Sequence, residues 1–231
     1  MVKKPRPGQR DPRHGTGLRP LNGPNRILVT HFDPFGKDSL NVSQEVATHL
    51  PHDSALIIEP IGTSKRDVDE RVPVLLREIK PDAVLALGQA EGRAVPSLEW
   101  IGVNLIHSSM PDNRQETHYG VPIIPGGPAA YFTTLPVLRL EHTVKSEGLP
   151  ILLSPSAGLF MCNQALYLFS HHGPTTPVGF LHLPSLPEQA TGNPERATMA
   201  LLLQVRIVTR ILQDIKDWLV EGQPVWEGHP R

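Results

Sequence analysis

The sequence predicts a three-layer α/β/α sandwich around a twisted, mostly parallel but mixed sheet. Short apolar runs rich in β-branched residues alternate along the chain with longer segments whose apolar residues recur at helical spacing. This alternation is typical of strands joined by crossover helices. The strand-like runs are apolar at nearly every position, as expected for strands that are covered on both faces. A chain of 231 residues is long enough for one such domain and its core.

The first half of the domain is expected to contain three strands and two helices. The first apolar run ends at Thr30, and Pro34 and Gly36 force a loop after it, since proline disfavours helical geometry in the residue before it. The second helix carries its apolar residues on one stripe and is stopped by Pro81. The expected strands are 26–30, 55–61 and 83–87, and the expected helices are 41–50 and 65–80.

The second half continues the alternation with one interruption. Residues 108–128 are rich in proline, glycine and asparagine. We therefore expect an excursion from the sheet, such as a small hairpin that covers the active face or a partner subunit. The helix that starts at Tyr131 is expected to end before Gly148, because glycine commonly follows a helix C-terminus. The expected strands are 101–107, 150–153 and 178–183, and the expected helices are 131–147, 160–169 and 194–220.

The two ends of the chain are expected to lie outside this domain, which is assigned to 26–221. Residues 1–25 hold six basic residues against one acidic residue, a net charge of +5, and because the whole chain carries −1 the remainder carries −6. The segment is rich in proline and glycine, which predicts a disordered tail. A nucleic-acid arm is the alternative, but the acidic remainder offers no second basic surface, so we expect no nucleic-acid partner. Residues 222–231 are assigned to a short C-terminal tail.

Cysteine content and hydropathy predict a cytoplasmic protein. Cys162 is the only cysteine, which excludes an intrachain disulfide and fits a reducing compartment. No apolar run approaches the roughly 18 residues of a membrane helix, and no apolar stretch typical of a secretory signal follows the basic start, so we expect no membrane partner. Eleven histidines are present, but none form the H-E-x-x-H motif, so we expect no metal site.

One cysteine, one histidine and one glutamate form a candidate catalytic group. Cys162 lies near the start of a predicted helix, where unpaired N–H groups and a partial positive charge favour a thiolate and lower the thiol pKa. The alternative is that Cys162 is a small buried hydrophobic residue of the core. His182 is either a base or a hydrogen-bonded core residue, and Glu99 either orients it or is a solvated charge. Because a thiol needs a base and the base needs an orienting group, the three residues support one another if they meet at one edge of the sheet.

Two loops that follow strands carry further candidates. Phe32 and Phe35 lie on the loop after the first strand. They are either core anchors or the walls of an apolar pocket, since ligands in open α/β sheets bind beyond the carboxyl ends of strands. Residues 88–93 follow the third strand and read G-Q-A-E-G-R. A glycine-bearing loop can hold phosphate, but this spacing matches neither the Walker A motif nor the dinucleotide fingerprint.

Four blocks of sequence carry a further signal when they are taken together. They are T-H-F-D-P-F-G at 30–36 with N-V-S at 41–43, G-Q-A-E-G-R at 88–93 with Glu99 and Asn104, S-P-S-A-G-L-F-M-C-N at 154–163, and G-F-L-H-L-P at 179–184 with L-P-E-Q at 186–189. In this order and with these separations, the blocks resemble the motifs of the type I pyroglutamyl peptidases, also called pyrrolidone-carboxylate peptidases. The resemblance extends over residues 26–220.

The resemblance implies a cysteine exopeptidase that removes N-terminal pyroglutamyl residues from peptides through a thioester, without metal or cofactor. It implies Cys162 as the nucleophile, His182 as the general base and then acid, and Glu99 as the residue that orients His182. It also implies a homo-oligomer, either a dimer or a tetramer. The lactam ring of the substrate would lie against the two phenylalanines. The positions that match the substrate pocket of the family are Phe32, Phe35, Gln89 and Arg93, the last near the reacting carbonyl.

Four residues depart from the family pattern. His31, Lys37 and Glu91 stand where the family has glycine, and Trp100 stands where it has arginine. A side chain at position 31 would be strained if the backbone needs a positive φ there. Glu91 could pair with Arg93, and the missing arginine removes a positive charge beside the catalytic glutamate. These departures predict an altered turnover or substrate range.

Two other functions stay open at this point. A nucleoside phosphorylase would use Arg93 to bind phosphate and Phe32 or Phe35 to stack on a purine, and Cys162 would have no role in it. A non-catalytic homologue would keep the pocket and bind pyroglutamate without cleaving the peptide. Replacement of Cys162 by serine separates the first of these from a peptidase, because only the peptidase needs the thiol as a nucleophile.

Overall fold

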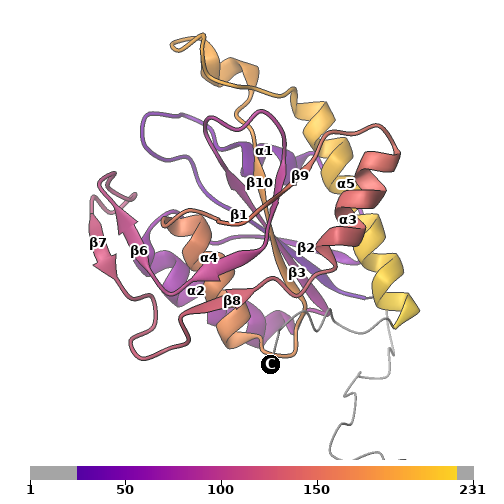
Figure 1. Ribbon diagram of the computed structural model, residues 1–231, viewed down its shortest axis with the longest axis horizontal. Helices are drawn as coiled ribbons and strands as arrows, with labels where there is room; N and C mark the ends of the chain where they lie inside the picture. Colours follow the sequence, from indigo (N-terminus) through magenta and orange to yellow (C-terminus); the bar gives the residue numbers. More distant parts are fainter. Residues whose placement is uncertain (1–24, 223–231) are drawn as a thin grey trace, which may run out of the picture.

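The computed structural model describes residues 25–222. The predicted basic tail, except for its last residue, and the predicted C-terminal tail after residue 222 lie outside the described residues. Residues 25–222 form three layers, with helices on both faces of a central sheet (Figure 1). The predicted α/β/α sandwich is therefore confirmed. None of the helices in this part of the chain has the length and apolar character that crossing a membrane requires.

The central sheet has six strands in the order β2-β1-β3-β10-β4-β9. β2, β1, β3 and β10 are parallel, whereas β4 is antiparallel to β10 and parallel to β9. The prediction of a mostly parallel, mixed sheet is confirmed. The strands are β1 (Ile27–His31), β2 (Leu56–Pro60), β3 (Ala83–Gln89), β4 (Ser97–Glu99), β9 (Leu152–Ser154) and β10 (Val178–Leu183).

The helices of the described chain divide between the two faces of the sheet (Figure 1). Strand alternation separates two cores: Ile27 and Val29 of β1 belong to one apolar cluster, and Leu28 belongs to the other. The first cluster includes residues of α1 (Val42–Thr48), α3 (Val137–Ser146) and α5 (Leu201–Glu221), and the second includes residues of α2 (Lys65–Ile79) and α4 (Met161–His172). A short 3₁₀ helix, η1 (Pro187–Ala190), follows β10.

The segment after β4 leaves the main sheet, so the single strand predicted over 101–107 is instead two short strands that belong to separate small sheets. The Asn163 side chain on α4 accepts a hydrogen bond from Val103 N at 2.8 Å and donates one to Val103 O at 2.9 Å. Gly102 permits this approach, because a Cβ there would lie 3.0 Å from a backbone nitrogen of α4. Contacts with α4 thus replace pairing with the main sheet. The segment forms β5 (Ile101–Val103), which pairs with β8 (Ala130–Phe132), and β6 (Ile106–Ser108), which pairs with β7 (His118–Val121).

The antiparallel strands β6 and β7 form a hairpin that projects from the side of the sheet (Figure 1). This hairpin confirms the predicted excursion. Its connecting loop folds back onto the N-terminus of α2, where the backbone N–H of Lys65 donates to Asp112 at 3.0 Å. In the same loop, the Asn113 side chain donates to the Pro34 carbonyl at 2.9 Å. The hairpin therefore lies next to the loop that follows β1.

Two helices start later in the chain than the periodicity predicts. α3 begins at Val137, because the residues before it bond to β10 instead; Thr133 Oγ1 donates to Val178 O at 2.7 Å. α5 begins at Leu201 rather than near residue 194. In the intervening segment, the side chain of Arg196 donates to Asp38 on the loop after β1. Interactions with distant segments therefore override the local helical pattern in both places.

Candidate active site

A histidine and a glutamate on neighbouring strands form the centre of the candidate active site. His182 on β10 is 4% exposed and Glu99, the last residue of β4, is fully buried. His182 Nδ1 lies 2.7 Å from Glu99 Oε1. The sequence predicts Glu99 in front of a strand that starts at Ile101, whereas the structure places it inside the main sheet. Because β4 is antiparallel to β10 and pairs Ser97 with His182, two adjacent strands hold the pair.

Cys162 lies in the first turn of α4, as its place in the sequence predicts. Its sulfur contacts β3 at Gly88, where an added Cβ would lie 2.8 Å from Sγ. Gly88 is the register partner of His182 in the parallel pair of β3 and β10. The same added Cβ would lie 2.7 Å from Phe180 Cζ, and Phe180 shares a face with His182 by strand alternation. The structure therefore brings the three predicted residues together, although no hydrogen bond among residues 25–222 joins Cys162 Sγ to the imidazole.

The surroundings keep both the thiol and the imidazole neutral. Burial, and then the charge of Glu99, raises the pKa of the Cys162 thiol to about 12, although the charge of Arg93 acts in the opposite direction. The expectation of a lowered thiol pKa is therefore wrong for this structure. Burial also lowers the pKa of His182, against the opposing hydrogen bond to Glu99. A neutral imidazole that donates its Nδ1–H to a carboxylate presents Nε2 as a proton acceptor.

Arg93 binds the glutamate of the pair. Its Nη1 donates to Glu99 Oε1 at 2.7 Å, and its Nη2 donates to the Ser156 carbonyl at 3.3 Å. Arg93 and His182 thus share one oxygen of Glu99, while the other oxygen, Oε2, is buried without a hydrogen-bond partner in the described chain. Arg93 supplies a positive charge beside the carboxylate. The predicted pairing of Arg93 with Glu91 is wrong, because Glu91 lies 3.7 Å from Arg196 instead.

The two phenylalanines of the first loop occupy different positions. Phe32 is 2% exposed and belongs to the core cluster beneath the site. Its ring centroid is 6.4 Å from that of Phe180, which in turn lies 4.9 Å from the ring of His182. Phe35 is only partly buried, with its centroid 6.3 Å from that of Phe160, and lines a cavity of about 600 Å³. Phe32 thus lies behind Phe180, which contacts His182, whereas Phe35 faces the cavity.

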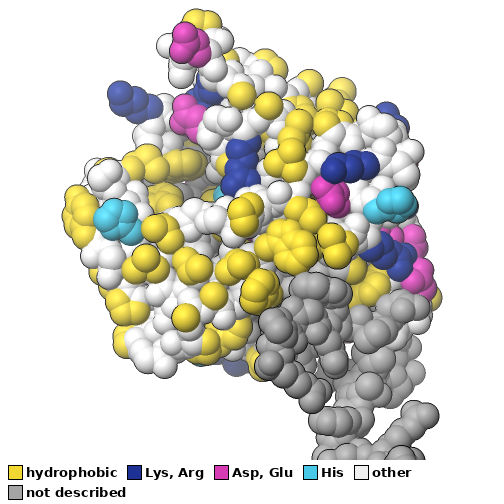
Figure 2. Space-filling view, in the orientation of Figure 1, with side chains coloured by type: hydrophobic (Ala, Val, Ile, Leu, Met, Phe, Trp, Pro, Cys, Tyr) yellow, Lys and Arg dark blue, Asp and Glu magenta, His cyan; other side chains and the backbone are white. Residues whose placement is uncertain are grey.

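This cavity lies between the loop after β1, the hairpin and the segment before α5. Figure 2 shows the surface hollowed between the hairpin on the left and the segment before α5 at the top, with basic and acidic side chains beside the hollow. The residues that line it include Phe35, Lys37, Asp38, Glu91, Met110 and Arg196. Two of the four departures, at positions 37 and 91, therefore lie on the wall of this cavity.

Gln89 makes its contacts with other protein groups. Its Nε2 donates to Asp38 at 2.8 Å, and its Oε1 accepts hydrogen bonds from Val42 N at 3.1 Å and from Gln189 Nε2 at 3.0 Å. Because side chains alternate along β3, Gln89 points to the face opposite Gly88 and the thiol. Sequence reasoning missed the partners Asp38 and Arg196, which are isolated charges in loops without a recognisable motif.

The remaining departures do not strain the backbone. Within the described chain, only Lys80 and Gln115 among residues other than glycine have a positive φ, so the strain expected at His31 is absent. His31 is buried at the end of β1, on the face opposite Phe32, and its Nδ1 has no hydrogen-bond partner. Burial lowers the pKa of His31. Trp100 packs against the core cluster shared with α3 and α5.

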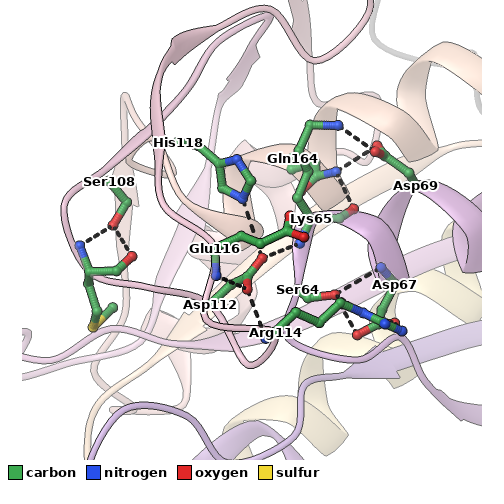
Figure 3. A network of polar contacts seen from close by, with 11 residues as sticks. Ser64, Lys65, Asp67, Asp69, Ser108, Asp112, Arg114, Glu116, His118 and Gln164 are labelled. Carbon is green, nitrogen blue, oxygen red and sulfur yellow. Dashed lines mark hydrogen bonds and ion pairs between the residues drawn. The ribbon is translucent and has the colours of Figure 1, made fainter.

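A polar cluster on the hairpin loop is the one place in the described residues where three potential metal ligands meet (Figure 3). The ligand atoms of Asp112, Glu116 and His118 lie within 4.8 Å of one another. However, the Asp112 carboxylate already accepts four N–H groups: Arg114 N at 2.8 Å, Glu116 N at 3.1 Å, Lys65 N at 3.0 Å and His118 Nε2 at 3.3 Å. Because N–H groups already surround this carboxylate, its oxygens are not arranged to bind a cation. The cluster instead anchors the hairpin to α2, together with the pair of Arg114 and Asp67.

Comparisons with known proteins show the family to which the chain is similar. A family model described as pyroglutamyl peptidase matches residues 25–216. The pyrrolidone-carboxylate peptidase of Gloeobacter violaceus is 37% identical over 198 residues, which cover 83% of this chain and 97% of that protein. The pyrrolidone-carboxylate peptidase of Thermococcus onnurineus is 37% identical over 195 residues, which cover 81% of this chain and 97% of that protein.

Solved structures show the same similarity. A mutant pyrrolidone carboxyl peptidase from Pyrococcus furiosus superposes with a TM-score of 0.79 at 31% identity, covering 84% of this chain and 99% of that one. The pyrrolidone carboxyl peptidase from Thermococcus litoralis superposes with a TM-score of 0.80 at 26% identity, covering 90% of this chain and 100% of that one.

Proposed function

The chain belongs to the pyroglutamyl peptidase family, a family of cysteine-type hydrolases, and from this premise we propose that Cys162, His182 and Glu99 form its catalytic triad. The triad would remove N-terminal pyroglutamyl residues from peptides by thioester acyl transfer. The observation that carries the proposal is the 2.7 Å contact between His182 Nδ1 and Glu99 Oε1, with the thiol held over the strand next to that of His182.

The reaction begins with a neutral thiol. His182 Nε2 takes the proton of Cys162 as the sulfur attacks the carbonyl carbon of the pyroglutamyl residue. The tetrahedral intermediate then expels the amine of the next residue, which receives the proton from Nε2, and leaves a thioester. Water attacks the thioester with His182 again as the base, and the thiol leaves with the returned proton. Catalytic hydrogen bonds often tighten only when substrate is bound, so the missing bond between thiol and imidazole is compatible with this sequence.

Charged and polar groups around the triad support these steps. Glu99 fixes the imidazole in the tautomer that exposes Nε2 and stabilises the imidazolium that forms. Arg93 favours the ionised form of Cys162 through its charge and holds Glu99 through a hydrogen bond of its own. The backbone N–H groups of the first turn of α4, including that of Cys162, have no intrahelical partners and are suited to stabilise an oxyanion.

Selectivity for pyroglutamate follows from the apolar surroundings. The lactam nitrogen carries no charge, so it can enter a slot beside the ring of Phe35, which lines the cavity, with little loss of hydration. A free α-ammonium group would lose its hydration in the same slot at a cost of several kcal/mol. Peptides that begin with pyroglutamate are therefore the proposed substrates. The role of Phe32, Gln89 and Arg93 in this slot would be indirect, because each is committed to protein contacts.

The alternatives are weaker. A nucleoside phosphorylase requires Arg93 to be available for phosphate, but Arg93 is bound to Glu99. A non-catalytic binding homologue has the same pocket, and only a measurement of turnover separates it from a peptidase. The cytoplasmic location, the dimer or tetramer, and the expectation that the protein needs no nucleic acid, membrane, metal or cofactor all stay predictions.

Hydrolysis of a pyroglutamyl arylamide tests the proposal. The wild type should release the chromophore, and Cys162→Ser should reduce kcat by roughly 10³-fold or more, as removal of a triad nucleophile does. Ser170→Ala, on the same helix, is the matched control and should keep full activity, since Ser170 Oγ donates to the backbone of its own helix. A wild type that binds pyroglutamate without releasing the chromophore would favour the non-catalytic homologue.

A further inference from the structure

We propose that Asp38 and Arg196 are positioning residues that set the affinity for substrate, because together they hold the wall of the cavity beside Phe35 in place. The inference rests on the proposed function and names two residues that act on the substrate pocket through other groups. They belong to a polar clamp that consists of the side chains of Asp38, Gln89, Gln189 and Arg196.

The core of the clamp is a two-pronged ion pair. Arg196 Nη1 donates to Asp38 Oδ1 at 3.0 Å and Nη2 donates to Asp38 Oδ2 at 2.7 Å. This parallel geometry is specific to arginine and gives direction as well as attraction. The Arg196 side chain is only 7% exposed and that of Asp38 is 20% exposed, so water screens the pair far less than it screens a surface ion pair.

Arg196 also fixes the segment that leads into α5. Its Nε donates to Ser185 Oγ at 2.8 Å, and its Nη1 donates to the Gln189 carbonyl at 3.2 Å. Residues 185–196 include η1 and form the upper segment beside the hollow (Figures 1 and 2). The guanidinium therefore binds this segment to Asp38, which belongs to the loop after β1.

Asp38 also binds the side chain at the end of β3. Its Oδ2 accepts hydrogen bonds from Gln89 Nε2 and from Gln189 Nε2, both at 2.8 Å. Gln89 is the last residue of β3 and directly follows Gly88, against which the sulfur of Cys162 lies. Gln89 Oε1 in turn accepts from Val42 N at the start of α1. One carboxylate thus joins the loop after β1, the end of β3 and the segment before α5.

The clamp lies where it can affect substrate affinity without affecting the chemical steps. Asp38 and Arg196 line the cavity of about 600 Å³ together with Phe35, whereas none of their hydrogen bonds goes to Cys162, His182 or Glu99 in the described chain. Loss of the clamp would free the loop that carries Phe35 and the segment before α5, so substrate would have to order them on binding, at a cost in affinity. The bound complex would still contain an intact triad.

The experiment compares Arg196→Gln with a matched control, Arg139→Gln. Arg139 makes a similar pair of contacts, to Glu221 and Asp214, and joins α3 to α5 far from the site. Both variants should lose thermal stability. Only Arg196→Gln should raise KM for a pyroglutamyl arylamide, by about tenfold, with kcat within about twofold of wild type; tenfold corresponds to ~1.4 kcal/mol. Arg196→Lys keeps the positive charge but cannot form the two parallel hydrogen bonds of a guanidinium. It should therefore keep part of the affinity that Arg196→Gln loses.

Two further measurements distinguish a failure of this inference from a failure of the proposed function. The double variant Asp38→Asn with Arg196→Gln should raise KM by clearly less than the product of the two single-variant factors, because the two side chains act as one unit. Binding of a pyroglutamyl peptide to the Cys162→Ser protein, measured by calorimetry, should weaken by the same factor when Arg196→Gln is added. This binding measurement tests the inference even if the wild type shows no turnover. Equal KM values in Arg196→Gln and Arg139→Gln, or a fall in kcat without a change in KM, would overturn the inference.

Discussion

His182 Nδ1 and Glu99 Oε1 lie 2.7 Å apart on two antiparallel strands, in a place where both side chains are almost wholly buried. The pair is therefore set by the register of β4 against β10 rather than by a flexible loop. Arg93 donates a hydrogen bond to the same oxygen. The carboxylate is held by two partners, and its charge is available to an imidazolium that forms during the reaction.

Replacement of Glu99 by glutamine should impair turnover more than folding. The amide cannot stabilise the imidazolium and can hold the imidazole in the wrong tautomer, so we expect kcat to fall by roughly 10²–10⁴-fold. Pyroglutamyl arylamide kinetics and thermal unfolding of the same preparation provide the measurement. Glu141→Gln, which breaks a surface pair with Lys145, serves as the control. If kcat recovers at lower temperature in step with the folded fraction, Glu99 is a structural residue.

Alkylation of Cys162 in the free protein should be slow at neutral pH. Burial raises the thiol pKa to about 12, and only the thiolate reacts with iodoacetamide. The rate, followed by mass spectrometry, should rise about tenfold per pH unit between roughly pH 7 and 10. The denatured protein should instead level off near the ordinary thiol pKa of 9.0. A native rate that levels off below pH 8 would show that the thiol is activated before substrate binds.

The pH profile should show an acid limb below the ordinary histidine range. Burial lowers the pKa of His182 below its usual 6.5, and the imidazole must be neutral to accept the thiol proton. Activity expressed as kcat/KM should therefore hold at pH 6.5 and fall only at lower pH. The lowered pKa also makes stability depend on pH: between 6.5 and the lowered value the unfolded state binds the proton more readily than the folded state, so the free energy of unfolding falls as pH falls through this range. Urea unfolding across this range should show the loss, and an acid limb centred above 6.5 would contradict the assignment.

Addition of one methyl group to β3 should disturb the site. In Gly88→Ala the new Cβ would lie 2.8 Å from Cys162 Sγ and 2.7 Å from Phe180 Cζ, closer than these atoms can pack. We expect the thiol to be displaced, with kcat lowered by at least about tenfold and stability lowered by about 1–3 kcal/mol. Gly192→Ala is the control, because no atom lies within 4 Å of its added Cβ. Full activity of Gly88→Ala would mean that the thiol works from another position.

Local patterns predicted the elements that local interactions define. The strand at 178–183 was predicted with its observed bounds, because prolines flank an apolar run there. The helix at 65–79 was predicted to within one residue, because its apolar stripe is regular and Pro81 stops it. The three residues of the candidate triad were named from their residue types and from the resemblance of the four blocks to a family, and their catalytic roles stay predictions. The meeting of Cys162, His182 and Glu99 in one place was a hypothesis that only the fold could test.

Long-range contacts account for what the sequence did not predict. Arg196 binds Asp38 across 158 residues, and neither charge stands out in its own segment. The segment at 101–107 has the composition of a strand, but Asn163 and Gly102 draw it onto α4. The sequence also indicated a lowered thiol pKa from the helix N-terminus alone, whereas the depth of the sulfur and the charge of Glu99 outweigh that effect.

The parallel register that sets Gly88 opposite His182 has a dynamic consequence. Cys162 is on α4 and its sulfur packs against β3 at Gly88, whereas His182 is on β10, the strand next to β3. We therefore expect that a change of side-chain torsion, and not the displacement of a lid or a domain, brings sulfur and imidazole to proton-transfer distance. Solvent viscosity should then leave the acylation rate unaffected.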